Sequence, residues 1–275
     1  MHEILIPGKS AALVAAIRDN TFAYLVRRAK LRQAEVRIDD DFIWTFENPA
    51  RPMCLLRRRL PPGEPEKEIE RLLQGLERAG GPRAGIDVVE PAPLIERLSA
   101  FGLEPTEVEY GMAVPLAQFD RTLLERDRLQ IKKVGDKNAL AQCAEVVALG
   151  RGRQAADFFR VVHGELEEGE EQSKFYLASG KDGPVAFAGQ FFAAGISAVW
   201  WVTTIPAMRR RGVGTAVTAA ALLDAKEMGY QVASLLAVPG VQRMYQRLGF
   251  TECCRVAFFE WRAGSVPQRE AAQPL

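Results

Sequence analysis

The fold is decided by residues 198–215, which read AVWWVTTIPAMRRRGVGT. The apolar start of this stretch is rich in β-branched and aromatic residues, a composition that favours a buried strand. Pro206 opens a short turn, and a pattern rich in Ala, Leu, Lys and Glu follows from Ala216 to Met228, where Gly229 supplies a stop. The stretch therefore predicts a strand, a turn and a helix in direct succession.

The turn is suited to bind an anion. Residues 209–215 would direct successive backbone N–H groups outward from a helix N-terminus, where the helix dipole is positive. Gly212 and Gly214 carry no side chain, so a ligand can approach the backbone closely there. We expect a phosphate or pyrophosphate group held by the backbone.

Two other readings of this turn fit the sequence less well. Val217 stands where a dinucleotide-binding fingerprint needs glycine, and no Gly-Lys-Ser/Thr follows for a P-loop. The run Arg209-Arg210-Arg211 could be a solvated basic patch or could bind nucleic acid, but a formal net charge of +1 gives no field that attracts nucleic acid.

Length and composition limit the class of protein. The 275 residues suit two domains of ordinary size, and 48% hydrophobic with 26% charged residues is a globular balance. No apolar run reaches membrane-helix length, and the N-terminus lacks a signal-peptide pattern. Four cysteines without zinc spacing and two histidines, His2 and His163, predict reduced thiols and no metal site. We expect a cytoplasmic protein with neither a nucleic-acid nor a membrane partner.

Periodicity and turn residues predict further elements along the chain. Gly180 to Gly183 has the composition of a hairpin turn, and Asp136 is placed to cap a helix. We expect helices at 10–32, 66–78, 93–101, 136–150, 154–165 and 241–248, and strands at 36–38, 42–46, 53–56, 86–89, 107–114, 129–134, 174–179, 185–194, 230–237 and 251–261.

An internal repeat organises these elements. Residues 93–104 and 240–251 each read as a short amphipathic helix, a glycine, an apolar residue and the start of a strand, and the elements before them follow the same order. This repeat predicts two related domains, 1–125 and 126–262, followed by a tail at 263–275. Chance similarity of strand–helix–strand units is the alternative.

Two motifs in the second half occur in a fixed order: the turn at 209–214 and, after a predicted helix and strand, Tyr245 with Gly249-Phe250. With this pair the second half resembles the GNAT family of acetyl-CoA-dependent N-acetyltransferases. The family's pyrophosphate motif stands here as Arg209-Arg210-Arg211-Gly212-Val213-Gly214, with Pro206 three residues ahead of it. The family's C-terminal signature stands as Tyr245 with Gly249-Phe250, separated from the first motif by a predicted helix and strand. The resemblance covers about residues 128–262 and extends more faintly to the first half.

The resemblance implies an α/β (α+β) fold with two GNAT-like domains, each a mixed, mostly antiparallel twisted sheet flanked by helices. It implies acetyl-CoA as co-substrate and Tyr245 as the acid that protonates the departing CoA thiolate. The implied binding residues, whose backbone would contact the pantetheine arm or the pyrophosphate, are Val202, Thr203, Thr204, Arg209, Arg210, Arg211, Gly212, Val213, Gly214 and Thr215.

The implied reaction is direct attack of a primary amine, from a small-molecule or peptide acceptor, on acetyl-CoA, with a homodimer allowed. Two departures from the family's pattern bear on it. Val238-Pro239-Gly240 replaces an asparagine, and no Asp or Glu lies between Val185 and Thr204. Water, Asp157 or an acid in 165–171 is left as the base. The alternatives are a non-catalytic CoA or acyl-CoA sensor and, less favoured, an interaction scaffold with a vestigial pocket.

The first half lacks both signatures. Its loop at 60–65 offers prolines without N–H groups and a Glu that repels phosphate, and Leu98 stands where the repeat has Tyr245. We expect this half to be a degenerate domain that binds no CoA and instead shapes the acceptor cleft. We also expect Trp200 and Trp201 to lie on opposite faces of their strand, because side chains alternate along a strand.

Overall fold

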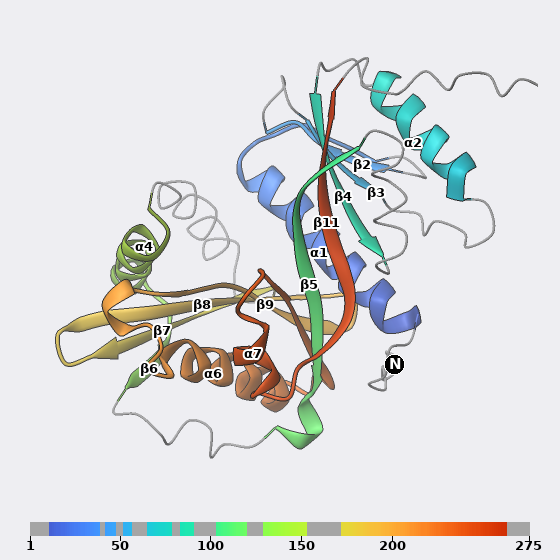
Figure 1. The fold of residues 1–275 in the computed structure, drawn as a ribbon. Helices are drawn as coiled ribbons and strands as arrows, with labels where there is room; N and C mark the ends of the chain where they lie inside the picture. The colour runs from blue at the N-terminus through green and yellow to red at the C-terminus, as the bar shows by residue number, and fades with distance from the viewer. Residues whose placement is uncertain are drawn as a thin grey trace, which may run out of the picture. The chain divides into compact units, whose positions relative to one another are not determined.

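The computed structural model describes residues 11–38, 42–47, 52–56, 65–78, 83–90, 103–119, 129–152 and 172–262. The chain forms two compact units (Figure 1). Unit 1 contains Met1–Arg32 and Tyr110–Cys253, and unit 2 contains Gln33–Glu109 and Cys254–Leu275. These units differ from the predicted domains 1–125 and 126–262. The reason is that helix α1 (Ala11–Leu31) packs in unit 1, and that strands β5 (Glu104–Pro115) and β11 (Thr251–Arg262) each pass from one unit into the other.

Unit 1 is built on a mixed, mostly antiparallel sheet with the strand order β5-β10-β9-β8-β7-β6. Its only parallel neighbours are β9 and β10, and every other described pair is antiparallel. The bounds are β6 (Gln130–Lys133), β7 (Ser173–Gly180), β8 (Gly183–Ala193), β9 (Ile196–Thr204) and β10 (Val232–Ala237). This is the sheet type that the sequence predicted.

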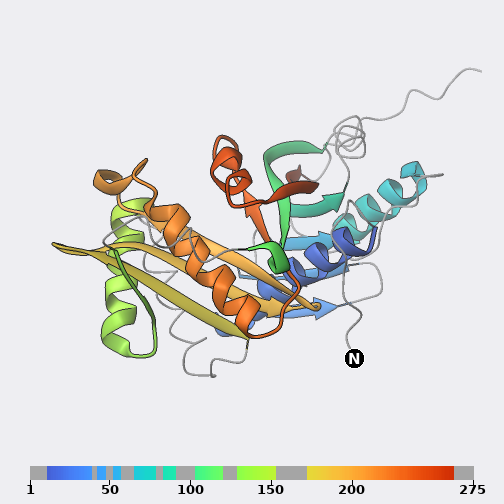
Figure 2. The ribbon, with the colours of Figure 1, turned by 90° about the horizontal axis from the view of Figure 1, so that it is seen from below.

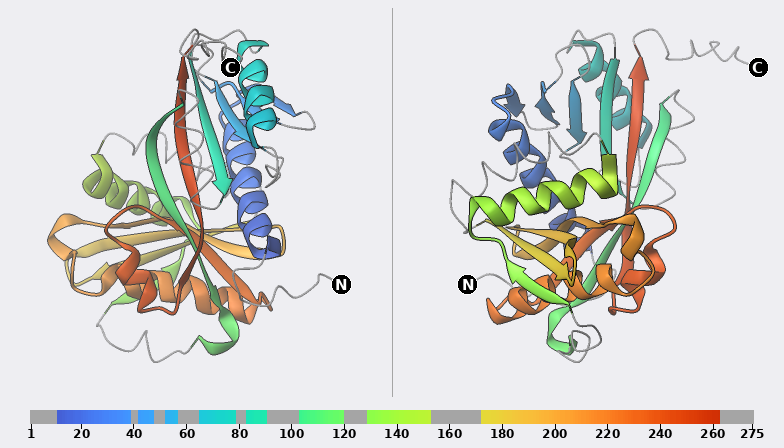
Figure 3. Two further views of the ribbon diagram at one scale, coloured as in Figure 1. Left: turned by 45° about the vertical axis from the view of Figure 1, so that its right-hand side comes forward. Right: turned by 90° about the vertical axis from the view of Figure 1, so that its left-hand side faces the viewer.

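Helices cover both faces of the unit 1 sheet (Figures 2 and 3). Side chains alternate between faces along each strand, so Phe175, Leu177 and Phe187 pack against α4 (Lys137–Arg151). Tyr176 and Ala188 face the other way, into the cluster that contains α6 (Val213–Glu227). Helix α1 lies on the α4 face, where the ring of Tyr24 meets Phe191. The short elements are η1 (Leu116–Gln118), η4 (Pro206–Met208) and α7 (Gln242–Gln246).

The strands of unit 2 follow the order β1-β2-β3-β4-β11-β5. Strands β2 and β3 are antiparallel, β3 and β4 are parallel, and β4 and β11 are antiparallel. Helix α2 (Pro65–Arg78) approaches β2 closely, because a Cβ on Gly75 would lie 3.0 Å from the ring of Phe42. The bounds are β1 (Val36–Ile38), β2 (Phe42–Thr45), β3 (Met53–Leu56) and β4 (Arg83–Glu90).

The structure confirms most predicted elements to within a few residues. Asp136 is confirmed as a helix cap, since its carboxylate accepts the amide of Ala139 at 2.8 Å. The predictions that lie outside the described residues are the helices at 93–101 and 154–165, the acidic run 165–171, the loop 60–64, both histidines and the tail. Among the described helices, none combines the length and apolarity needed to span a membrane.

Candidate functional site

The two parallel strands of unit 1 separate before they end. Three residue pairs join β9 to β10, and the last of them is Val199 with Leu235. Beyond this pair β9 continues to Thr204 and β10 to Ala237, and no further pairing joins these two fully described strands. The backbone of residues 200–204 therefore faces a gap in the sheet, where a ligand could take the place of a neighbouring strand.

A bulge in β9 lies at this gap. Phe187 pairs with Thr203 and Gly189 pairs with Trp200, so Trp201 and Val202 together oppose a single residue of β8. Trp201 adopts φ +59°, a left-handed conformation that bulky residues rarely take. A bulge of this kind bends its strand and increases the local twist.

The bulge corrects the prediction that Trp200 and Trp201 lie on opposite faces. Both side chains contact Tyr24 of α1: the ring of Trp200 stacks on it at 4.2 Å, and Trp201 Nε1 donates a hydrogen bond to Tyr24 Oη. The prediction was wrong because the extra residue of a bulge breaks the alternation of faces.

The turn at residues 209–215 opens α6. Gly212 caps the helix with φ +82°, and Arg210 has φ +60°. The amide of Arg209 already bonds Pro206 O at 3.3 Å, and the first helical amide in a bond is that of Ala216, to Gly212 O at 2.9 Å. Between them, residues 210–215 donate no backbone N–H to any described residue. A helix start with this many available amides is suited to bind an anion.

Gly214 brings the turn against the end of β9 and the start of α7. A Cβ at this position would lie 3.3 Å from Thr204 Oγ1 and 3.4 Å from Met244 Sδ. Val213 beside it is buried in the core and anchors the turn. The predicted residues Thr204 and Gly214 are therefore neighbours, and the next residue after Met244 is Tyr245.

Tyr245 lies at the edge of the same core. Its side chain is 7% exposed and its ring meets Phe250 edge-on at 5.9 Å. Its carbonyl accepts the amides of Leu248 and Phe250, at 2.9 and 3.1 Å, which closes the helix where the Gly249-Phe250 signature begins. The signature thus fixes the turn after α7, and the acid role of Tyr245 stays a prediction.

Two arginines join the end of α4 to the end of β9. Arg209 donates from Nη2 to Gly150 O at 2.9 Å and from Nε to Thr204 O at 3.2 Å. Arg151 donates from Nε to Thr203 Oγ1 at 3.0 Å and from Nη2 to Val202 O at 3.4 Å. Thr203 therefore faces α4, while Thr204 faces Gly214. The sequence pointed to neither Arg151 nor Tyr24, because no local pattern links them to β9.

A polar network holds α6 on the sheet at its far end. Asp224 accepts Lys133 Nζ at 3.0 Å and Lys174 Nζ at 2.8 Å, and Tyr176 Oη lies 2.8 Å from it. Gln190 Nε2 donates to Ala221 O at 2.8 Å. Burial alone would raise the pKa of Asp224, but the hydrogen bonds from Lys174, Tyr176 and Lys133 outweigh it and lower this pKa.

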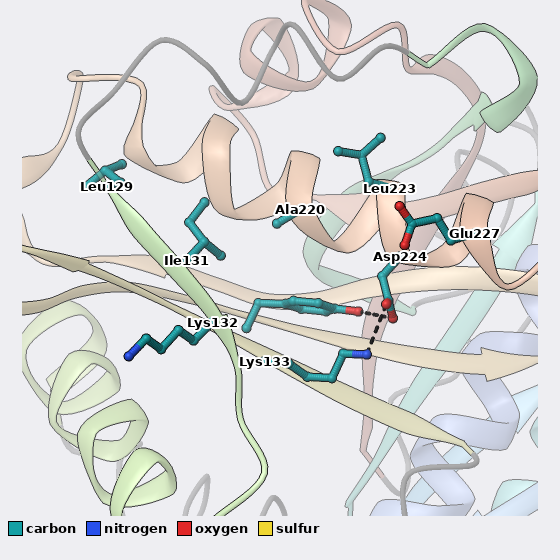
Figure 4. Close-up of a pocket in the computed structure, with 9 residues that line it drawn as sticks. Leu129, Ile131, Lys132, Lys133, Ala220, Leu223, Asp224 and Glu227 are labelled. Atoms are coloured by element: carbon teal, nitrogen blue, oxygen red, sulfur yellow. Dashed lines mark hydrogen bonds and ion pairs between the residues drawn. The ribbon is translucent and has the colours of Figure 1, made fainter.

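The same network lines a pocket of about 410 Å³ between β6 and α6 (Figure 4). Asp224 lies ten residues after Gly214, which is about 15 Å along a helix. The ion pairs of Asp224 with Lys133 and Lys174 help to hold α6 on the sheet. Because its carboxylate is already paired, Asp224 offers no base to the gap between β9 and β10.

Three further predictions concern the segment 238–240, the catalytic base and a metal site. Gly240, in the segment that replaces the family's asparagine, has φ +91° and donates its amide to Gln242 Oε1 at 2.8 Å. Asp157 and residues 165–171, named as bases, lie outside the described residues. Within the described part of the chain, no group of three or more His, Cys, Asp or Glu side chains could hold a metal ion.

Comparison with known proteins gives one domain match and the fold. Residues 171–252 match the acetyltransferase (GNAT) domain, a segment that contains the gap, the turn and α7. A GCN5-related N-acetyltransferase from Kribbella flavida has 18% identity, with 93% of this chain and 97% of that chain covered and a TM-score of 0.66. One from Sphaerobacter thermophilus has 17% identity, with 85% and 76% covered and a TM-score of 0.60.

A third similar structure is a tandem GNAT protein from the clavulanic acid biosynthesis pathway. It has 12% identity, with 81% of this chain and 78% of that chain covered and a TM-score of 0.59. At these identities the three structures show a shared fold. A comparison with curated proteins found no match.

Proposed function

We propose that this chain, whose residues 171–252 form a GNAT acetyltransferase domain, is an acetyl-CoA-dependent N-acetyltransferase that transfers an acetyl group to a primary amine by direct attack. The observation that carries the proposal is the gap between β9 and β10 beside a helix start with available amides. An extended arm that ends in a pyrophosphate fits this pairing of a strand-like gap with an anion site.

Different segments of the chain would bind different parts of acetyl-CoA. The amides of 210–215 would hold the pyrophosphate, and the backbone of Val202, Thr203 and Thr204 would pair with the pantetheine arm. The side chain of Arg209 holds the end of β9 against α4, since it donates hydrogen bonds to Thr204 O and Gly150 O. Bound acetyl-CoA would supply the acetyl group as a thioester. A backbone N–H of the bulged strand would polarise its carbonyl.

Tyr245 is the proposed acid. A phenol can protonate the departing thiolate as the carbon–sulfur bond breaks, because their ordinary pKa values, about 10 and about 8.5, lie close together. The amine nitrogen forms the new bond to the acetyl carbon, the carbon–sulfur bond breaks, and the Tyr245 hydroxyl gives its proton to the sulfur. The amine's proton passes to water, Asp157 or an acid in 165–171. The acceptor is a small-molecule or peptide amine.

We assign this activity to the cytoplasm, since the four cysteines lack the spacing of a zinc site or a disulfide framework, and a homodimer is allowed. The test has two stages. Calorimetry of the full chain with acetyl-CoA should give one site per chain. A panel of amines followed by thiol release should then identify at least one amine that liberates CoA. Absence of binding at high micromolar protein would end the proposal.

A sensor that holds CoA or acyl-CoA without turnover is the second candidate. It is favoured by the 7% exposure of Tyr245 and by the lack of any carboxylate from Val185 to Thr204. Binding of acetyl-CoA with no CoA release for any amine would identify the sensor. Release with a single amine would exclude it.

A further inference from the structure

Helix α1 contacts the reactive region of unit 1 although it lies far outside the matched segment 171–252. Tyr24 is buried, its ring stacks on Trp200 at 4.2 Å and meets Phe191 edge-on at 5.4 Å, and its hydroxyl accepts a hydrogen bond from Trp201 Nε1. A residue 177 positions away in sequence therefore holds the indole of the bulged tryptophan.

Helix α4 contacts the same tryptophan from its other end. The guanidinium carbon of Arg151 lies 5.5 Å from the centre of the Trp201 ring, a cation–π distance. The same guanidinium donates to Thr203 Oγ1 and Val202 O, and Thr203 Oγ1 donates to Trp201 O at 2.8 Å. Arg151 thus contacts every residue of the bulge and the residue after it.

The bulge needs such support because its backbone is strained. A non-glycine residue with positive φ costs free energy, and it persists only when its surroundings hold it there. Without the extra residue, β9 would continue in regular register with β8. The faces of Val202, Thr203 and Thr204 would then be exchanged, because a shift of one residue reverses every following side chain.

We propose that Tyr24 and Arg151 are positioning residues, which hold Trp201 from two helices and thereby fix the backbone of residues 202–204 along the gap between β9 and β10. This inference rests on the proposed acetyl transfer for its effect on rate. Its structural part, that these two side chains fix the bulge, holds independently of any ligand.

The first variant is Tyr24→Phe, which removes only the hydroxyl and keeps both ring contacts. We expect kcat to fall roughly tenfold to a hundredfold, as expected for misplacement of a reacting group by up to about 1 Å. The Kd for CoA should rise by a smaller factor than kcat falls, since the amides of 210–215 are not touched. Tyr230→Phe is the matched control: this ring also contacts a phenylalanine, Phe192 at 5.0 Å, but has no contact with the bulge.

The second variant is Arg151→Lys, which keeps the charge and loses the guanidinium's two directed bonds. Like Tyr24→Phe, it should lower kcat by a larger factor than it raises the Kd for CoA. Arg18→Lys on α1 is its control, because Arg18 pairs only with the exposed Asp19 among the described residues. Normal kcat in both Tyr24→Phe and Arg151→Lys would overturn the proposal.

Amide hydrogen exchange gives a readout that needs no substrate. Peptides covering 200–204 should exchange faster in Tyr24→Phe and in Arg151→Lys than in wild type, while those covering β10 should not change. If the wild type fails to transfer acetyl groups, the proposed function fails, and the exchange result alone then decides: faster exchange supports the positioning role, and unchanged exchange overturns it.

Discussion

The two units share one order of strands and helix, but only unit 1 carries the features of the proposed site. In unit 1 an antiparallel pair, β8 and β9, leads through a turn to α6 and then to β10, which is parallel to β9. In unit 2 the pair β2 and β3 is followed by α2 and then by β4, which is parallel to β3. Each parallel pair is joined by three registered residue pairs. This shared order is what the predicted duplication requires.

The units differ where the first strand of the parallel pair ends. In unit 1, β9 continues five residues beyond its last pair with β10 and contains a bulge. In unit 2, the described residues of β3 extend to Leu56, one residue after its last pair with β4. Helix α6 begins at a turn that contains Gly212 and Gly214. Helix α2 begins with Pro65 and Glu66; Pro65 has no N–H to donate, and the charge of Glu66 repels a phosphate. A common frame is therefore not sufficient for the site, which also needs an overlong strand and a glycine turn.

The largest expected effect is that of Tyr245→Phe. General acid catalysis contributes about a hundredfold to ten-thousandfold, so kcat should fall within this range if Tyr245 protonates the thiolate. The Kd for acetyl-CoA should not change. Stopped-flow thiol release measures kcat and calorimetry measures Kd. An unchanged kcat would assign Tyr245 to the core alone, as its burial allows.

A second change tests whether only unit 1 binds acetyl-CoA. Gly214→Val would press on Thr204 and Met244, and overpacking costs roughly 1–3 kcal/mol. We expect the Kd for acetyl-CoA to rise roughly tenfold to a hundredfold, measured by calorimetry. Gly75→Ala, which presses on Phe42 in unit 2, is the control and should leave this Kd unchanged. An equal loss in both variants would contradict separate roles for the units.

Two buried thiols report on the two units separately. Burial raises the pKa of the Cys143 thiol in α4 to about 12, so it should be alkylated only when unit 1 opens. Acetyl-CoA at ten times its Kd should slow this reaction about tenfold. Cys54, which is buried in β3, should keep its rate if acetyl-CoA binds to unit 1 alone, as we propose. Mass spectrometry after timed alkylation gives both rates, and equal slowing at Cys54 would show that the units open together.

The smallest expected effect concerns Asp224 and pH. Its pKa is lowered in the folded state, so its contribution to the free energy of unfolding is present above the unfolded-state pKa of about 3.9 and is lost as pH falls through the folded value. Asp224→Asn should lower the urea midpoint at pH 7, and the difference from wild type should shrink below about pH 4. A difference that is constant with pH would show that the contribution does not depend on the charge.

The sequence predicted the elements of unit 1 well because each of them carries its own local signals. The apolar run at 198–205, the glycines at 212 and 214 and the cap at Asp136 all act within a few residues. The bulge at Trp201 escaped prediction, since it is stabilised by Tyr24 and Arg151, which are 177 and 50 residues away. The division into two units depends on strand pairing between distant segments, which leaves no local mark in the sequence.

Amide hydrogen exchange of the full chain with and without acetyl-CoA tests the central claim most directly. We predict slower exchange with acetyl-CoA at residues 200–204 of β9 and at 210–215, and no change in β3, α2 or β4. Protection in unit 2, or none at residues 210–215, would contradict the claim that the glycine turn and the bulged strand of unit 1 form the acetyl-CoA site.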